Sequence, residues 1–363
     1  MNPSRATLSG SPFGTAPDGR PVRRWRLDSG TGVCADVLTY GGTLHRLRVP
    51  DPSGAVEDVV LTLPGIEAYA AEQPFLGALV GRYANRLAHG RFTLDGTAHQ
   101  VPATDRGHAL HGGPGGFHRQ VWQAAPDRAN GPKRAALRLE LHSPDGDMGF
   151  PGALDVTVVY ALDQDGTLAI DYRARTDRPT VVNLTNHAYF NLAGAGRGDI
   201  LGHTLALDAD AYLPVTPEAI PSGPPEPTAG GPFDFGAPRP IGERIADEHP
   251  QLADAGGYDH CFVLTAAPAG LRRAARLADP GSGRVLEVWT TEPGIQVYTG
   301  NALDGSLTGR HAKPYERHGA VCLETQHFPD APNHPEFPGT VLRPGEEFRS
   351  RTEFRFPHLA VRS

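Results

Sequence analysis

Turn-forming residues interrupt this sequence along its whole length, and they restrict the chain to short secondary-structure elements. Glycine and proline, with 44 and 35 of the 363 residues, make up more than a fifth of the chain, against an average usage of about 12%. They are spread from end to end and do not gather in one tail, so they indicate frequent turns. We therefore expect many short elements joined by tight connections.

Between the turns, apolar and polar residues alternate, which is typical of half-buried β-strands. The alternating positions are Leu137, Leu139 and Leu141; Leu154, Val156, Val158 and Tyr160; Leu168, Ile170 and Tyr172; and Leu286, Val288 and Thr290. Hairpins are predicted at the DQDG turn (163–166) and at Asp95-Gly96. Helical periodicity is confined to 65–75 and should end before Pro74. The pattern predicts an all-β fold, a large antiparallel β-sandwich with few short helices.

The length allows two average domains, but large all-β folds often run this long as one unit. Residues 221–232, PSGPPEPTAGGP, are expected to form neither a ladder nor a helix, because proline removes donors and glycine raises the cost of ordering. The segment is either an interdomain linker or a long surface loop. Strand signals of the same type on both sides favour the loop, so we expect a single domain over residues 1–363.

Charge and hydropathy narrow the choice of partner and compartment. The net charge is −7 with acids and bases interspersed, which argues against nucleic acid or an anionic membrane as a main partner. The cationic cluster VRRWR (22–26) is expected on a solvated strand face. No apolar stretch approaches the roughly 18–20 residues of a membrane helix, no apolar signal core is present, and the three distant cysteines do not suggest a disulfide framework. We expect a cytoplasmic protein, a monomer or a homodimer.

Two runs concentrate hydrogen-bonding side chains among apolar residues. VNLTNHAYFNL (182–192) contains His187, and CLETQHFPDAPNH (322–334) contains Glu324. Histidine and glutamate have unperturbed pKa values of about 6.5 and 4.3, so the pair can exchange protons near neutrality. The H-E-x-x-H, phosphate-loop and G-x-S-x-G patterns are absent from the sequence. These observations favour acid–base chemistry on a polyhydroxylated substrate, with no metal, cofactor or covalent nucleophile.

Four further segments carry polar residues suited to a ligand: GRYANR (81–86), GHALHGGPGGF (107–117), GYDH (257–260) and GIQVYTGN (294–301). Structural alternatives remain open. Glu324 could be a buried carboxylate paired with an arginine, Arg82 and Arg86 could pair with acids across strands, and Asp259 could be a turn residue. The histidines expected to be solvent-facing or loop residues are His108, His118, His311, His318 and His334.

Taken in this order, the segments resemble the aldose 1-epimerase (galactose mutarotase) family. The matching motifs run over nearly the whole chain: TYGGTLHRLRVPD (39–51), GRYANR, LHGG, NHAYFNL, YDH, TTEPGIQVYTGN and LETQHFPDAPNHPEFP. The resemblance implies one large antiparallel β-sandwich, the galactose mutarotase-like supersandwich, whose concave face holds the sugar. It also implies interconversion of the α and β anomers of a free hexose.

Within that family, the residue matching Glu324 acts as the base and the residue matching His187 as the acid. A bell-shaped pH dependence is expected, with the acidic limb from Glu324 and the basic limb from His187. The sugar-binding positions implied by the matching motifs are Asn85, Arg86, His111, Tyr189, Asp259 and Gln296. Arg82 matches its motif, but we do not expect it on the sugar.

The sequence departs from the family pattern at two positions. Gly42 stands where alanine is common, and Thr216 stands where an acidic residue is usual. The proline-rich segment after Ile220 could reshape the pocket rim and alter sugar preference. Three other functions stay open: glycoside hydrolysis by Asp259 and Glu324, sugar binding without catalysis, and epimerisation of a hexose 6-phosphate, which needs a cationic pocket.

Overall fold

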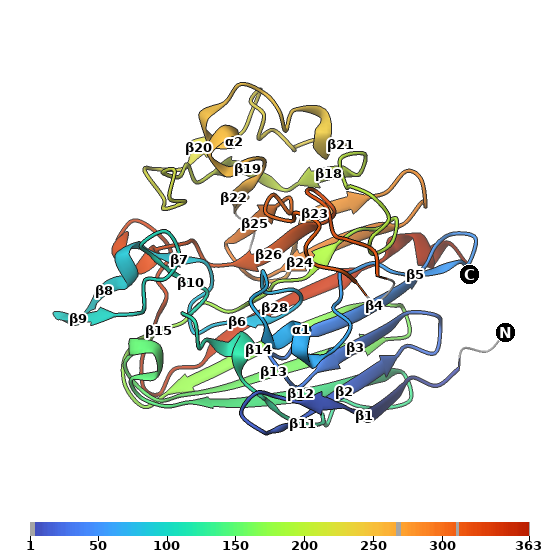
Figure 1. Cartoon of the computed structure of the whole chain (residues 1–363), viewed down its shortest axis with the longest axis horizontal. Coiled ribbons are helices and arrows are strands. Elements are labelled where there is room, and N and C mark those ends of the chain that lie inside the picture. The colour runs from blue at the N-terminus through green and yellow to red at the C-terminus, as the bar shows by residue number, and fades with distance from the viewer. Residues whose placement is uncertain (1–3, 266–269, 310–311, 363) are drawn as a thin grey trace.

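The computed structural model describes residues 4–265, 270–309 and 312–362, and within these ranges the chain consists mainly of antiparallel strands (Figure 1). The helices are short. The α-helices are α1 (Ile66–Ala70) and α2 (Pro250–Ala255), and the 3₁₀ turns are η1 (Ala88–Gly90), η2 (Phe117–Arg119), η3 (Asp147–Gly149), η4 (Ile241–Glu243), η5 (Ala331–Asn333) and η6 (Pro357–Arg362). None of the described helices combines the length and apolar character needed to cross a membrane.

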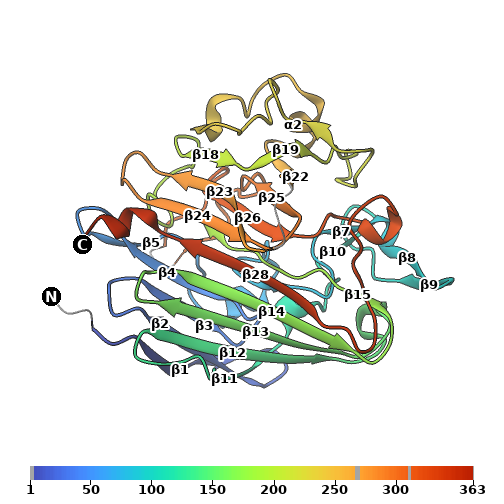
Figure 2. The same ribbon diagram turned by 180° about the vertical axis from the view of Figure 1, so that it is seen from behind.

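The largest sheet has nine strands, and most of them can be followed side by side in the view from behind in Figure 2. In spatial order they are β11 (Gln123–Pro126), β12 (Arg134–Ser143), β13 (Leu154–Asp163), β14 (Leu168–Thr176), β28 (Phe348–Arg355), β24 (Val285–Thr290), β23 (Arg272–Ala278), β18 (Thr204–Leu207) and β21 (Arg239–Pro240). The predicted strands lie in β12, β13, β14 and β24. The hairpin at 163–166 is confirmed, because Leu162 pairs with Leu168 across the turn.

Two further sheets have five and six strands. The five-stranded sheet contains β1 (Thr7–Thr15), β2 (Pro21–Asp28), β3 (Cys34–Leu38), β4 (Leu44–Pro50) and β5 (Val56–Asp58). The six-stranded sheet has the order β17 (Tyr189–Phe190), β26 (Val321–Gln326), β25 (Gly294–Tyr298), β22 (Asp259–Leu264), β19 (Ala209–Tyr212) and β20 (Glu226–Pro227). The cationic cluster 22–26 falls within β2, as expected of a strand, and Arg23 is exposed.

Short ladders occupy the connections: β6 (Leu79–Val80) with β16 (Thr185–Asn186), β7 (Arg86–Leu87) with β10 (Ala109–Leu110), β8 (Arg91–Leu94) with β9 (Thr97–Gln100), and β15 (Thr180–Val181) with β27 (Val341–Leu342). The hairpin predicted at Asp95-Gly96 is confirmed between β8 and β9. Both turn residues have positive φ, 48° and 80°, which is the backbone geometry of a type I′ turn.

One apolar cluster joins the three large sheets into a sandwich. It contains Val37 from the five-stranded sheet, Val156 and Ile170 from the nine-stranded sheet, and Phe262 and Leu323 from the six-stranded sheet. Burying a side chain of this size stabilises the fold by about 1.5–3 kcal/mol relative to exposure. The predicted antiparallel β-sandwich with few short helices is therefore confirmed.

The proline-rich segment 221–232 departs from expectation at one point. Glu226 and Pro227 form β20 and pair with Tyr212 and Ala211, so the expectation that no ladder forms here is wrong for these two residues. β20 is the last strand of its sheet, and an edge strand tolerates proline because one side of it needs no donor. The second α-helix was also not predicted, because six residues are too few to show a helical period.

Candidate active site

Neighbouring strands of the six-stranded sheet bring three polar side chains onto one face. Gln296 in β25 lies directly opposite Glu324 in β26, and directly opposite residues of an antiparallel pair share a face of the sheet. Asp259 opens β22, the next strand along, and its Oδ1 accepts a 2.7 Å hydrogen bond from Nε2 of Gln296. Asp259 is thus a strand residue held in a side-chain network, and the turn interpretation is wrong.

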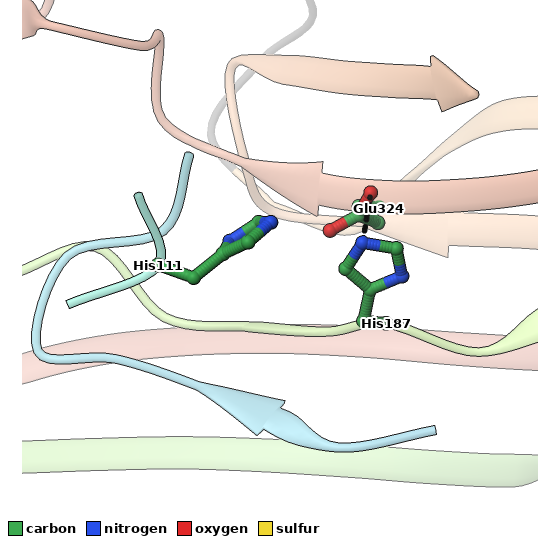
Figure 3. Close-up of side chains that lie close together, drawn as sticks. All are labelled: His111, His187 and Glu324. Carbon is green, nitrogen blue, oxygen red and sulfur yellow. Dashed lines mark ion pairs between the residues drawn. The ribbon is translucent and has the colours of Figure 1, made fainter. Parts of the chain in front are cut away.

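His187 brings its imidazole to the carboxylate of Glu324. It lies between β16 and β17, where its N–H donates to Ala78 and its carbonyl accepts from Gly77. Its Nε2 is 3.5 Å from Oε1 of Glu324, and the two side chains are only 7% and 2% exposed (Figure 3). His187 and Glu324 are far apart in the sequence, but the fold places their side chains in contact.

His111 approaches the same point from the loop after β10 (Figure 3). The backbone N–H of Asn85 donates to its Nδ1 at 3.2 Å, so the neutral ring carries its proton on Nε2. Burial lowers the pKa of His111 well below its ordinary value, which keeps the ring neutral near pH 7. His111, His187 and Glu324 could each offer one metal-ligating atom within 4.8 Å of the others. With Nδ1 engaged and Nε2 protonated, however, His111 is a hydrogen-bond donor, which suits an oxygen acceptor better than a cation.

The two arginines of GRYANR serve different purposes. Arg82 is buried and donates to the carbonyls of Ser143, Pro151 and Gly152, so it holds loops together. Arg86 faces the site, and its Nε donates to Oδ2 of Asp105 at 2.8 Å. The structural alternative for Arg86, a pair with an acid, is thus present, although Asp105 lies in the loop between β9 and β10 and not on a neighbouring strand, and Arg86 still borders the site.

All eight residues named from the sequence line one cavity of about 780 Å³: Asn85, Arg86, His111, His187, Tyr189, Asp259, Gln296 and Glu324. Its rim is formed in part by Val215, Thr216, Pro217 and Ala219. Thr216, which stands where the family usually has an acidic residue, is thus a rim residue. The proline-rich residues 221–232 do not line the cavity.

Burial controls the protonation of the central pair. It raises the pKa of Glu324 well above its ordinary value, and the nearby charge of Asp259 adds to this effect. Burial also lowers the pKa of His187. Glu324 has no arginine partner within the described ranges, and its Oε2 has no hydrogen-bond partner there. The environment therefore favours one proton shared between the two groups, and a buried acceptor remains that a ligand hydroxyl can satisfy.

Comparison with known proteins identifies the family. Residues 23–355 match the model of the aldose 1-epimerase family. The chain belongs to that family. It is 43% identical to galactose mutarotase of Rattus norvegicus over 345 residues, which cover 95% of this chain and 97% of that protein. It is 41% identical to aldose 1-epimerase of Escherichia coli (strain K12) over 344 residues, which cover 94% and 97%.

The fold agrees with that of a solved structure. The crystal structure of galactose 1-epimerase from Lactobacillus acidophilus NCFM matches with a TM-score of 0.85 at 28% identity. The match covers 97% of this chain and 98% of the other. The resemblance stated from sequence motifs is therefore confirmed at the level of family and fold.

The aldose 1-epimerase motifs did not reveal every residue at the site. The ring of Phe75 contacts those of His111, His118 and His187, with centroids 4.5, 4.7 and 5.9 Å away. Cys322 lies beside His187, and Asp105 holds Arg86. No spacing in the sequence signals these residues, because each acts through a contact made only in the folded chain.

Four of the five histidines expected to be solvent-facing or loop residues lie in the described part of the chain, and they divide into two groups. His318 and His334 are half-buried loop residues, in line with expectation. His108 and His118 are buried, so a solvent-facing position is wrong for both: Nδ1 of His108 accepts from the N–H of His89, and His118 packs against Phe75. His311 lies outside the described residues.

Proposed function

We propose that this chain is an aldose 1-epimerase that interconverts the α and β anomers of free aldohexoses, with glucose and galactose as substrates. The observation that carries the proposal is the contact between His187 and Glu324 inside a cavity lined with hydroxyl-binding side chains. Relatives named galactose mutarotase and aldose 1-epimerase, similar over nearly the full chain, support it.

The reaction moves one proton from one sugar oxygen to another. The carboxylate of Glu324 takes the proton of the anomeric hydroxyl, the C1–ring oxygen bond breaks, and protonated His187 gives its Nε2 proton to the ring oxygen. The ring opens to an aldehyde and leaves a neutral acid beside a neutral imidazole. Rotation about C1–C2 presents the other face of the carbonyl, and reclosure reverses both transfers. Each positioned acid or base contributes about 10²–10⁴-fold to the rate.

The pair must hold one proton for this cycle. The pair holds this proton on His187 before ring opening and on Glu324 after it, and burial favours the second form, in which both groups are neutral. Because burial raises the pKa of Glu324, the basic limb of the pH profile reports loss of its proton. Because burial lowers the pKa of His187, the acidic limb reports a second proton on that ring. The structure therefore favours the reverse of the limb assignment expected from the sequence.

The other lining residues suit a neutral polyol. Asp259 accepts hydrogen bonds, and the amide of Gln296 both donates and accepts. Arg86 offers a fixed fork of donors, and Nε2 of His111 offers one more. We assign sugar contacts to these four and to Asn85 and Tyr189. Apart from Asp259 and Glu324, whose pKa values burial raises, the cavity is lined by the carboxylates of Glu72, Asp105, Asp254 and Asp304, against the guanidinium groups of Arg86 and Arg106. Such a lining repels a phosphate group and disfavours a hexose 6-phosphate.

We extend the proposal to the organisation of the protein. Residues 1–363 form one domain of this type, since a single apolar cluster includes residues from Ala6 to Phe356. The protein acts on a small sugar in the cytoplasm, as a monomer or a homodimer, without nucleic acid, cofactor or metal. The net charge of −7 supports the absence of a nucleic-acid partner.

Polarimetry of freshly dissolved α-D-glucose and α-D-galactose tests the proposal, with the wild-type protein accelerating the change in rotation. Glu324→Gln and His187→Asn should each lower kcat by about 10²–10⁴-fold, since each removes one proton carrier. Sugar binding measured by calorimetry should persist in Glu324→Gln. The exposed Glu248→Gln serves as a matched control and should keep the wild-type rate. A wild-type rate in either active-site variant contradicts the assignment.

A further inference from the structure

A thiol contacts the edge of His187 that faces away from Glu324. Cys322 lies in β26 two residues before Glu324, so both side chains leave the strand on the same face. The Sγ atom of Cys322 is 3.5 Å from Nδ1 of His187, and Oε1 of Glu324 is 3.5 Å from Nε2. One strand therefore supplies a neighbour for each ring nitrogen.

Neighbouring aromatic rings fix the plane of the His187 imidazole, but they do not determine whether its Nδ1 edge or its Cδ2 edge faces Cys322. The ring of Tyr189 lies 5.0 Å away at 15° to it, and the ring of Phe75 lies 5.9 Å away at 20°. Half a turn about χ2 leaves the imidazole in the same plane but exchanges Nδ1 with the carbon Cδ2. A polar neighbour at that edge distinguishes the two arrangements, and the sulfur of Cys322 occupies that position.

We propose that Cys322 is a positioning residue that keeps a proton on Nδ1 of His187 and so directs Nε2 at Glu324 and the sugar ring oxygen. The inference rests on the proposed function. A neutral imidazole has one N–H and one lone pair, so a proton on Nδ1 places the lone pair at Nε2. There the ring can take the proton of Glu324 and pass it to the ring oxygen.

A thiol suits this task better than a stronger acceptor does. The ring must both gain and release a proton at Nε2 in each cycle, and Nδ1 keeps its proton throughout. Sulfur accepts hydrogen bonds weakly, so it orients the ring with little preference for the charged form. A carboxylate at the same place would stabilise the imidazolium through a charge-assisted hydrogen bond and hold the second proton.

The surroundings of His187 leave Glu324 as its partner in proton exchange. The titratable groups that face the ring are Glu324, Cys322, His111, His118, Tyr189 and Tyr298. Burial lowers the pKa of both histidines and raises the pKa of the two tyrosines and of Cys322. These five groups are therefore neutral near pH 7.

Two substitutions at Cys322 test the proposal in polarimetric assays. Cys322→Ala should lower kcat about 10-fold with KM within about twofold of wild type, because the ring loses its orientation but the sugar contacts remain. Cys322→Ser keeps a hydrogen-bonding atom and should recover kcat to within about threefold of wild type. The acidic limb of kcat should move up in Cys322→Ser and down in Cys322→Ala, because the hydroxyl accepts more strongly than sulfur and a methyl group does not accept.

A matched control separates positioning from packing. Cys34→Ser changes a buried cysteine of the five-stranded sheet and should leave kcat and its acidic limb unchanged. If Cys322→Ala keeps the wild-type kcat and acidic limb, or loses only thermal stability, the proposal is overturned.

The tautomer of His187 can also be measured in the wild-type protein, so this test does not depend on whether a variant folds. In protein labelled with ¹⁵N-histidine, the nitrogen shifts of His187 should show the tautomer with its proton on Nδ1. A proton on Nε2 of the neutral ring would refute the proposal. This result is distinct from a failure of the proposed function, which would appear as wild-type protein that does not accelerate mutarotation.

Discussion

At the scale of single residues, the position of Arg86 depends on a partner outside the family motifs. Nε of Arg86 donates to Asp105 at 2.8 Å, and the two side chains are 9% and 30% exposed. We expect Asp105→Asn to raise KM for galactose about fivefold with a smaller effect on kcat, because the lost charge weakens the hold on the guanidinium by about 1 kcal/mol. Steady-state polarimetry measures both constants.

A second ion pair provides the control for this prediction. Arg138 and Glu140 lie 3.6 Å apart and are both more than two-fifths exposed, so Glu140→Gln should change neither constant. An unchanged KM in Asp105→Asn would show that Arg86 does not depend on its partner.

The sequence indicated eight residues that line the cavity, but it missed others that line it or contact those eight, such as Phe75, Asp105 and Cys322. Each of the eight lies in a motif of several polar residues, and all eight line the cavity. Phe75 and Asp105 lie outside the polar motifs, and Cys322 opens the run that contains Glu324 without any signal of its own; their importance follows from distances to Arg86 and His187. Tertiary contacts of this kind have no period and no fixed spacing, so a single sequence does not show them.

At the scale of elements, alternation predicted the long strands well because their partners bury every second residue. The two strands that flank His187 are less visible: β16 and β17 have two residues each, too few for a period. The pairing of the edge strand β20 with β19 was also not predicted, because β20 contains a proline. The turn chemistry was more informative, and both predicted hairpins exist.

The turn between β3 and β4 leads to a prediction about Gly42, where the family commonly has alanine. Gly42 has a φ of +55°, and a Cβ atom there would overlap Cδ1 of Leu79. Gly42→Ala should therefore lower the free energy of unfolding by about 3 kcal/mol, from the left-handed backbone and the overlap together. Adding Leu79→Val should recover part of this loss, which a double-mutant cycle by urea denaturation measures.

Gly96→Ala isolates the backbone contribution. Its φ is +80° and no described atom would lie within 4 Å of the new Cβ, so the cost should be about 1 kcal/mol. Equal losses at the two glycines, or no coupling between Gly42 and Leu79, would contradict the steric explanation.

At the scale of the whole molecule, buried histidines link the fold to pH. Burial lowers the pKa of several of them: His111, His118, His187, His203 and His260. An unfolded histidine takes a proton near pH 6.5, whereas the folded ring stays neutral to lower pH. The unfolded state then binds more protons, so this part of the stability is complete above about pH 6.5 and is lost as the pH falls. Buried carboxyls with raised pKa, such as those of Glu324 and Asp259, act in the opposite direction.

One histidine away from the catalytic pair allows this linkage to be measured alone. His260 in β22 is fully buried, and burial lowers its pKa to about 3. As the pH is lowered from about 6 to 5, the free energy of unfolding of wild type should fall by about 1.2 kcal/mol more than that of His260→Asn, because the unfolded wild type takes up nearly one proton more than the unfolded variant. Val263→Ala in the same strand removes packing without a titratable group, so it should lower stability equally at each pH. Urea denaturation at several pH values in this range measures the free energy of unfolding. If it changes with pH equally in wild type and His260→Asn, the folded protein holds His260 in its charged form, which contradicts the prediction.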